Sequence, residues 1–195
     1  ATKGNFNNEI GVPLTLLRLE PGHEYAVIEL GANHIGEIAY TTQLTKPDVA
    51  VLNNVAQAHL EGFGDIFGVV RAKGEIFQGL SEQGVAIVNG DSEYKRDWLQ
   101  ALEAKFAGHS GQSIEFSIDD KSDALHGFVA EDIRLDASGC AQFELRYRSE
   151  STRVQLTLPG RHNVANAVAA AAACYAIGAD FDDIRQGLAT MIPVS

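Results

Sequence analysis

The stretch GVAIVN, residues 84–89, is an apolar run of strand length that no charged residue interrupts. Apolar residues on both faces of a strand are typical of a parallel sheet that is covered on both sides. Three other segments are mainly apolar runs of the same length, each with a single charged residue: YAVIEL at residues 25–30, DVAVLN at residues 48–53 and SIEFSI at residues 113–118. We expect these four segments to be strands of one mostly parallel sheet.

Helical patterns alternate with these strands, as connections between parallel strands require. Helices are predicted at residues 8–19, 36–44, 66–80 and 92–106. The alternation favours an α/β fold with a mostly parallel sheet and helices on both of its faces.

The pattern changes after residue 125. Three strand-like runs, at residues 127–135, 140–148 and 152–158, are separated by the turn sequences DASG and SES. They predict a small antiparallel three-stranded meander, and residues 125–158 are expected to form a β subdomain within one domain that covers residues 1–195. Two helices, at residues 163–177 and 181–191, end the pattern, and Asp180 is the expected N-cap of the second.

Composition excludes several classes of protein. The chain has 195 residues, of which 45% are hydrophobic, and a net charge of −11, which disfavours binding to nucleic acid or to an acidic membrane surface. No apolar run is long enough to cross a bilayer. Cys140 and Cys174 have no CxxC context and indicate free thiols in a reducing compartment; the alternative is one disulfide between them. The chain starts without a methionine, and we expect a piece of a longer, cytoplasmic protein.

The segment HNVANA, residues 162–167, opens an alanine-rich helix. Asn163 and Asn166 are three residues apart, so they lie on one face of its beginning. Amide groups beside unpaired backbone N–H groups suit a polar heterocycle or a phosphate. The alternative is structural, with asparagine as an N-cap and alanines for close packing.

Ionisable side chains lie at the expected carboxyl ends of the first two strands. Glu29 is the one charged residue in YAVIEL, and His59 follows DVAVLN in a polar loop. Ligands of open α/β sheets bind at this edge, where the two groups could share Mg²⁺ or Mn²⁺. Alternatively, Glu29 is solvated and His59 caps a helix.

Lys73 follows on the next predicted helix. A lysine in such a helix is most often a surface residue whose stem covers apolar neighbours. Alternatively its ammonium group, or a carbamate formed on it by CO₂, faces the metal.

These segments, in this order, resemble the central ATP-binding domain of the Mur ligases. The resemblance rests on ELGANHIGEI at residues 29–38, NNVAQAHLEGFG at residues 53–64, AKGEI at residues 72–76 and HNVANA, and it covers essentially the whole chain. It implies that Glu29, His59 and Lys73 are catalytic. Glu29 and His59 would be magnesium ligands, and Lys73, which is carbamylated in some members, would hold a second magnesium ion.

The resemblance also implies a nucleotide site. Asn163 and Asn166 would contact the adenine of ATP, and His162 belongs to the same motif. Asn5, in GNFNN, resembles a residue of a loop near the nucleotide phosphates, although a plain turn asparagine fits that position as well.

Within the family, NFNNEIGVPLTLL at residues 5–17 and ELGANHIGEI are most similar to the members that add D-alanyl-D-alanine. The implied activity is an ATP-dependent ligation of D-Ala-D-Ala to UDP-MurNAc-tripeptide through an acyl phosphate, with ATP and Mg²⁺ as cofactors and a monomeric enzyme. Asn33 and His34 could position the acceptor, although a loop histidine without function is equally consistent.

Two alternatives remain open: a non-catalytic nucleotide-binding module, and a sibling ligase with another acceptor. One departure from the family is plain, because the phosphate loop G-x-x-G-K-[ST] is not found and the chain begins with ATKG. We expect that loop, and the domains on either side, to lie outside these residues, and the chain alone to be inactive.

Overall fold

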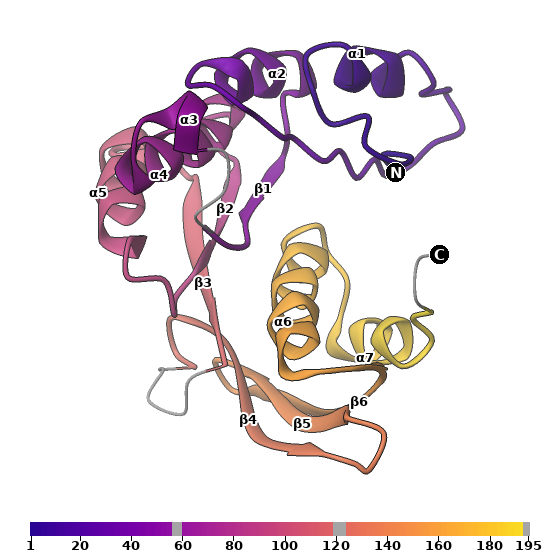
Figure 1. Cartoon of the computed structure of the whole chain (residues 1–195). Coiled ribbons are helices and arrows are strands. Elements are labelled where there is room, and N and C mark those ends of the chain that lie inside the picture. The colour runs from indigo at the N-terminus through magenta and orange to yellow at the C-terminus, as the bar shows by residue number, and fades with distance from the viewer. Residues whose placement is uncertain (56–59, 119–123, 193–195) are drawn as a thin grey trace.

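The computed structural model describes residues 1–55, 60–118 and 124–192, and in this part of the chain a six-stranded mixed sheet dominates (Figure 1). The strands lie side by side in sequence order; the first four pair in parallel, and the fourth, fifth and sixth pair antiparallel. The strands are β1 (Val49–Leu52), β2 (Val85–Asn89), β3 (Gln112–Ser117), β4 (Gly127–Leu135), β5 (Cys140–Tyr147) and β6 (Glu150–Pro159).

Helices occupy both sides of this sheet, and Figure 1 shows α4 and α5 on one side of β1–β3 and α6 on the other. The helices are α1 (Gly11–Leu16), α2 (Glu37–Thr45), α3 (Leu60–Phe63), α4 (Ile66–Gly74), the 3-10 helix η1 (Glu75–Gly79), α5 (Lys95–Phe106), α6 (Arg161–Ala176) and α7 (Phe181–Ala189). The predicted fold class is confirmed.

Strand β2 explains why both faces must be covered. Val85 and Ile87 belong to the hydrophobic cluster under α6, whereas Ala86 and Val88 belong to the cluster under α4, η1 and α5. Successive side chains of a strand point to opposite faces, so this apolar run contributes to both clusters. Its continuous apolarity is therefore a direct consequence of its two-sided burial.

Helix α6 lies close to the sheet because its buried residues are small. Ala167, Ala171 and Ala172 are at most 4% exposed, and α6 contacts all of β1 to β6. Alanine also has the highest helix propensity, so the same residues that permit close packing favour the helix itself.

The predicted meander is present and continues the main sheet. β4 pairs in parallel with β3 through Gly127 to Val129, so β4–β6 share the hydrophobic cluster of β2 and β3. The assignment of residues 125–158 as a subdomain stays a prediction. Asp180 caps α7 as expected, because its side chain accepts hydrogen bonds from the N–H groups of Asp182 and Asp183.

The N-terminal region differs from the sequence-based expectation. Residues 25–30 form no strand, and Tyr25 and Val27 are 67% and 71% exposed. Among the described residues, no strand pairs with this segment. Its backbone makes isolated hydrogen bonds instead: Thr2 N–H donates to the Val27 carbonyl (3.0 Å), and Glu29 N–H donates to the Thr2 hydroxyl (2.9 Å). An apolar segment becomes a β-strand only when a neighbouring strand pairs with its backbone N–H and C=O groups, and residues 25–30 have no such neighbour among the described residues. The predicted helix at residues 8–19 is likewise only the six residues of α1.

Two further expectations concern the chain as a whole. No helix in the described part is long and apolar enough to cross a membrane. Cys140 and Cys174 are free thiols, the first half-buried and the second exposed.

Two glutamates fix the start of α2 and the loop before it. The N-cap of α2 is Gly36, which has no side chain to cap with. The buried carboxylate of Glu75 takes the place of a capping side chain. It accepts hydrogen bonds from the N–H groups of Gly36 (2.8 Å) and Ala39 (3.0 Å). Glu37 accepts from Asn33 N–H (2.8 Å) and contacts His34 Nδ1 (2.9 Å).

We predict that Glu75→Ala lowers the free energy of unfolding by about 2–3 kcal/mol, since two N–H groups lose a charged acceptor at a buried site. Urea unfolding measures the loss. Glu75→Gln keeps one acceptor oxygen and should lose less. Equal unfolding midpoints for wild type and Glu75→Ala would refute this capping role.

A second prediction concerns pH. The pKa of Glu37 lies below its ordinary value of 4.5, first because Asn33 N–H donates to the carboxylate; partial burial opposes this, and His34 adds to it. A carboxylate whose pKa is lower in the folded than in the unfolded protein stabilises the fold at pH values above its unfolded-state pKa. This stabilisation is lost as the pH falls through the folded-state pKa. Glu37→Gln should therefore be less stable than wild type at about pH 7, and the gap should narrow on acidification to about pH 3. Urea unfolding at several pH values tests this; a gap independent of pH would contradict it.

Candidate functional site

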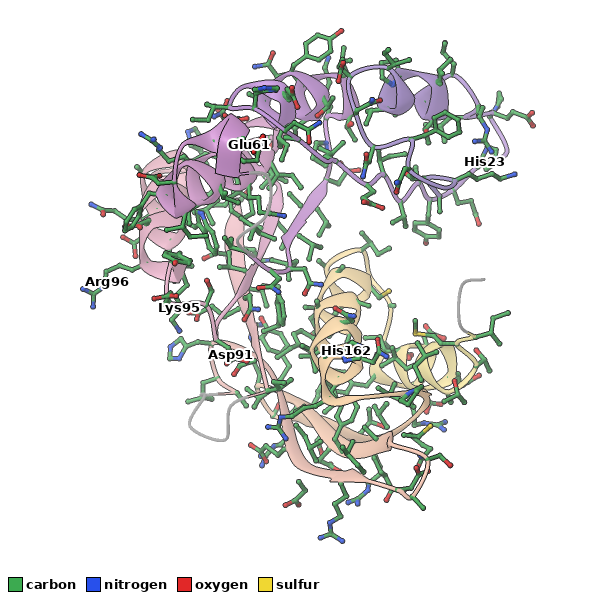
Figure 2. All side chains as sticks on the ribbon, viewed as in Figure 1. His23, Glu61, Asp91, Lys95, Arg96 and His162 are labelled. Atoms are coloured by element: carbon green, nitrogen blue, oxygen red, sulfur yellow. The ribbon has the colours of Figure 1, made fainter. Side chains whose placement is uncertain are left out.

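The first turn of α6 meets the carboxyl ends of the parallel strands. Arg161 donates to the carbonyl of Ile118, directly after β3, at 3.1 Å. The next residue, His162, is exposed, and Figure 2 shows it on the opening part of α6. Its ring lies over Gly160, where a Cβ would come within 2.6 Å of the ring and where φ is +100°. Only glycine suits this position.

Asn163 and Asn166 lie together on this turn, as the spacing predicts. Asn166 Nδ2 donates to Asn163 Oδ1 at 3.3 Å, and Asn163 Nδ2 donates to the Pro159 carbonyl at 2.8 Å. The N-cap of α6 is Gly160, so neither asparagine is an N-cap. The structural alternative for this pair is therefore wrong in its capping part, whereas close packing through alanine is correct.

Sequence analysis missed two asparagines that join this cluster. Asn53 follows β1, and its Nδ2 donates to Asn166 Oδ1 at 2.8 Å. Asn89 ends β2, and its Nδ2 donates to the backbone carbonyl of Asn53 at 2.8 Å. A signal for both was available, since two apolar strands end in asparagine at the edge where ligands of such sheets bind.

A cavity of about 520 Å³ is lined in part by Asn54, the residue that follows Asn53 in the chain. It brings together four of the predicted site residues from three segments of the chain: Asn5, Glu29 with Asn33, and Lys73. Asn7, Asn8 and Asn54 also line it, as do Leu30, Gly31, Ala32, Ile38, Phe63, Val69 and Ala72. Its polar lining is thus mostly amide groups, with one carboxylate and one amine.

Glu29 reaches this cavity from an extended segment. One oxygen, Oε1, accepts from Asn7 Nδ2 at 2.9 Å, and Gly31 N–H donates to the Asn7 carbonyl at 2.7 Å. A Cβ on Gly31 would lie 2.9 Å from the Asn7 amide, so glycine permits this approach. Among the described residues, no other side chain contacts the carboxylate, so its second oxygen faces no described partner.

Lys73 enters from the last turn of α4 and is half-buried. Its neighbour Ala72 is fully buried, so the last turn of α4 packs against the core. Among the described residues, no hydrogen-bond or ion-pair partner contacts the Lys73 ammonium group. A half-buried amine with no partner in the described part of the chain suits an anion or a covalent modification.

The remaining predicted residues are placed differently. His59 lies outside the described residues. His34 is exposed and pairs with Glu37, and it is not among the residues that line the cavity. Asn33 is held beside α3, where a Cβ on Gly62 would come within 2.0 Å of the Asn33 carbonyl, so that contact requires glycine.

A divalent metal fits this lining in one specific way. Within the described ranges, no three His, Cys, Asp or Glu side chains gather as a metal cluster. Glu29 is one carboxylate among amide oxygens, and Mg²⁺ is characteristically bound by one or two carboxylates together with substrate phosphates and water. The donor set suits a metal ion that a phosphate ligand shares.

Two consecutive residues connect the asparagine cluster of α6 with the cavity that Glu29 and Lys73 line. Asn53 bonds to α6, whereas Asn54 lines the cavity of Glu29 and Lys73. The asparagine cluster of α6 and the cavity therefore adjoin at the end of β1.

A larger cavity, of about 1050 Å³, lies between α4, η1 and α5. Its lining includes Phe67, Arg71, Trp98 and Lys105, and it contains none of the predicted site residues.

Comparisons with known proteins find similar sequences and similar structures. The chain is 49% identical, over 190 residues, to the UDP-N-acetylmuramoyl-tripeptide–D-alanyl-D-alanine ligase of Escherichia coli, in an alignment that covers 97% of this chain and 40% of that protein. A crystal structure of MurF from Acinetobacter baumannii superposes with a TM-score of 0.88 at 39% identity, covering 99% of this chain and 40% of the other.

A more distant structure, MurF from Thermotoga maritima in complex with ADP, has a TM-score of 0.77 at 27% identity and covers 99% of this chain and 42% of that one. The chain thus spans about 40% of the length of these relatives. Residues 1–174 match the description of the Mur ligase middle domain. With the strand-end site and these matches together, the chain belongs to the Mur ligase middle-domain family.

Proposed function

We propose that this chain is the ATP-binding domain of a ligase that joins D-alanyl-D-alanine to UDP-MurNAc-tripeptide. The relative from Escherichia coli carries that activity in its name, and the likeness extends over 97% of this chain. The complete reaction belongs to a protein of the relatives' length, in which this chain contributes the nucleotide site.

The observation that carries the proposal is the pair Asn53 and Asn54. Asn53 bonds to the asparagines of α6, and Asn54 lines the cavity with Glu29 and Lys73. A nucleotide has the matching layout, with a flat polar base at one end and a charged phosphate chain at the other. A base on α6 would then direct its phosphates towards Glu29 and Lys73, the one carboxylate and the one amine among the described residues of the cavity lining.

On the base side, Asn163 and Asn166 supply amide donors and acceptors for adenine, and His162 is exposed beside them. On the phosphate side, Asn5 offers an amide to the phosphate oxygens, in agreement with its position in the cavity lining. The positive end of the α6 dipole adds a favourable field for anionic ligands.

Glu29, His59 and Lys73 form the proposed catalytic and metal-binding set. Glu29 binds through its free oxygen, and a carbamate on Lys73 supplies two more. When bound, Mg²⁺ neutralises charge that builds up between the nucleotide phosphates and the acceptor carboxylate. This arrangement suits a protein with a net charge of −11, which must hold two anionic substrates.

In the proposed reaction, the terminal carboxylate of UDP-MurNAc-tripeptide attacks the γ-phosphorus of ATP and releases ADP. The resulting acyl phosphate is attacked by the amine of D-Ala-D-Ala, and inorganic phosphate leaves as the amide forms. Asn33, on the cavity wall, is suited to orient the acceptor carboxylate, and His34 lies just outside.

The decisive experiment uses the full-length protein that contains this chain. With ATP, Mg²⁺, UDP-MurNAc-tripeptide and D-Ala-D-Ala, we expect one inorganic phosphate for each amide formed. A nucleotide-binding module without catalysis would release no phosphate. A sibling ligase would release phosphate only with another amine or acceptor, which parallel assays identify.

We predict that Lys73→Arg lowers kcat roughly 100-fold or more, because arginine keeps the positive charge but forms no carbamate. Arg71→Lys, on the exposed side of α4, is the matched control and should keep kcat. A ¹³C NMR signal from labelled bicarbonate should appear on the wild type and be absent from Lys73→Arg. Full activity in Lys73→Arg would exclude the carbamate.

We also predict that Asn166→Ala raises the KM for ATP roughly tenfold, since losing a hydrogen bond to a bound base costs on the order of 1–2 kcal/mol. The fold should survive, because alanine is the better helix former. Initial rates and a thermal melt measure both effects. An unchanged KM in a well-folded Asn166→Ala enzyme would remove the adenine assignment and leave the metal site standing.

A further inference from the structure

Asn7 is held on the cavity wall by contacts that do not involve Glu29. Its N–H donates to the Asn5 carbonyl at 2.8 Å, and its own carbonyl accepts from Gly31 N–H at 2.7 Å. Its side-chain amide packs against Gly31, where a Cβ would lie 2.9 Å from Asn7 Cγ and Nδ2. Asn7 is half-buried and belongs to the cavity lining. The backbone of residue 7 and the place of its amide are therefore set independently of the carboxylate.

The hydrogen bond between Asn7 and Glu29 can form in only one sense. Asn7 Nδ2 donates to Glu29 Oε1 at 2.9 Å. An ionised carboxylate only accepts hydrogen bonds, so the nitrogen of the Asn7 amide, and not its oxygen, must face Glu29. The bond has a charged acceptor, and such bonds are stronger than those between neutral groups. Asn7 is thus a fixed donor that holds a charged side chain.

Glu29 depends on this donor because its side chain has little other restraint. The side chain is exposed, and among the described residues Asn7 makes the one hydrogen bond to its carboxylate. The Glu29 backbone is held separately, since its N–H donates to the Thr2 hydroxyl at 2.9 Å. A glutamate side chain rotates about several bonds, and a ligand that binds it must pay for the lost freedom. A carboxylate already held on the cavity wall loses less of that freedom.

We propose that Asn7 is a positioning residue that holds the Glu29 carboxylate on the cavity wall and thereby strengthens the binding of a divalent metal ion there. The proposal rests on the proposed function, because it takes Glu29 as a metal ligand. Asn7 acts through Glu29 and need not touch the metal. Gly31 is part of the same arrangement, since a residue without a side chain leaves room for the Asn7 amide.

The first measurement is the binding of Mn²⁺ to the full-length protein that contains this chain. The EPR signal of the free ion gives the dissociation constant, with ADP present and a solution of Mn²⁺ and ADP as the reference. Asn7→Ala removes the amide and keeps the backbone bonds, so we expect this constant to rise about three- to tenfold. Glu29→Ala removes the ligand and should raise it further. Gln142→Ala on β5 is the control, since it also removes an amide that bonds to a side chain, that of Arg153, and should leave Mn²⁺ binding unchanged.

Gly31→Ala tests the same contact without removing a polar group. The φ angle of Gly31 is not positive, so the backbone accepts alanine, but the added Cβ would displace the Asn7 amide. We expect Mn²⁺ binding to weaken by a factor similar to that of Asn7→Ala. Gly22→Ala is the matched control, because a Cβ on this exposed glycine would meet no atom within 4 Å. Thermal melts confirm that each variant is folded, and either Asn7→Ala or Gly31→Ala suffices for the test.

Initial rates separate positioning from a distorted cavity. If Asn7 only places a metal ligand, Asn7→Ala requires more free Mg²⁺ for its half-maximal rate, by the same factor as for Mn²⁺ binding, and saturating Mg²⁺ restores most of the rate. A distorted cavity would keep the rate low at every Mg²⁺ concentration, and this result would overturn the positioning role.

The double variant Asn7→Ala/Glu29→Ala shows whether Asn7 acts through Glu29. If it does, Asn7→Ala causes no further loss of Mn²⁺ affinity once Glu29 is alanine. A structural role independent of Glu29 would weaken Mn²⁺ binding by the same factor in both backgrounds, and the proposal would be wrong.

The outcomes distinguish the positioning role from the metal site itself. If Glu29→Ala weakens Mn²⁺ binding while Asn7→Ala and Gly31→Ala keep the wild-type dissociation constant, the positioning role is overturned and the metal site stands. If Glu29→Ala leaves Mn²⁺ binding unchanged, the assignment of Glu29 as a metal ligand fails, and the positioning role fails with it.

Discussion

The close packing of α6 on the parallel strands is the contact on which the site depends. Buried alanines such as Ala167 and Ala171 let the helix approach the sheet closely enough for its first turn to bond with residues at the strand ends. Because three strand pairs are parallel, those ends lie at one edge. Larger side chains on this helix face would move Asn166 away from Asn53, even if every polar residue were retained.

The end of β1 connects the two halves of the candidate site. Asn53 and Asn54 follow β1 directly; the Asn53 side chain bonds to α6, and Asn54 lines the cavity of Glu29 and Lys73. In the proposed function, this pair of residues places the base next to the phosphates. The inward-facing carboxylate and amine then give the cavity a polarity that suits phosphate and metal.

The N-terminal region illustrates the limit of a local pattern. Residues 25–30 have the composition of a buried strand, yet Tyr25 and Val27 are exposed, and the described residues supply no partner strand. Glu29 still reaches the cavity, because Asn7 and Gly31 hold the extended segment there. The Glu29 side chain is therefore positioned by short polar contacts, while the apolar residues Tyr25 and Val27 remain exposed.

The sequence by itself determined the α/β class, the positions of β1 to β6, the capping of α7 by Asp180 and the shared face of Asn163 and Asn166. These features depend on local rules: the spacing of apolar residues along the chain, the residue types found at turns, and the spacing that puts residues on one face of a helix. The tertiary structure alone decided that Asn53 and Asn89 join that face, that Glu29 and Lys73 line one cavity, and that β4 continues the main sheet. Such contacts join residues far apart in the chain, and their geometry depends on how closely α6 packs on the sheet, which no local pattern records.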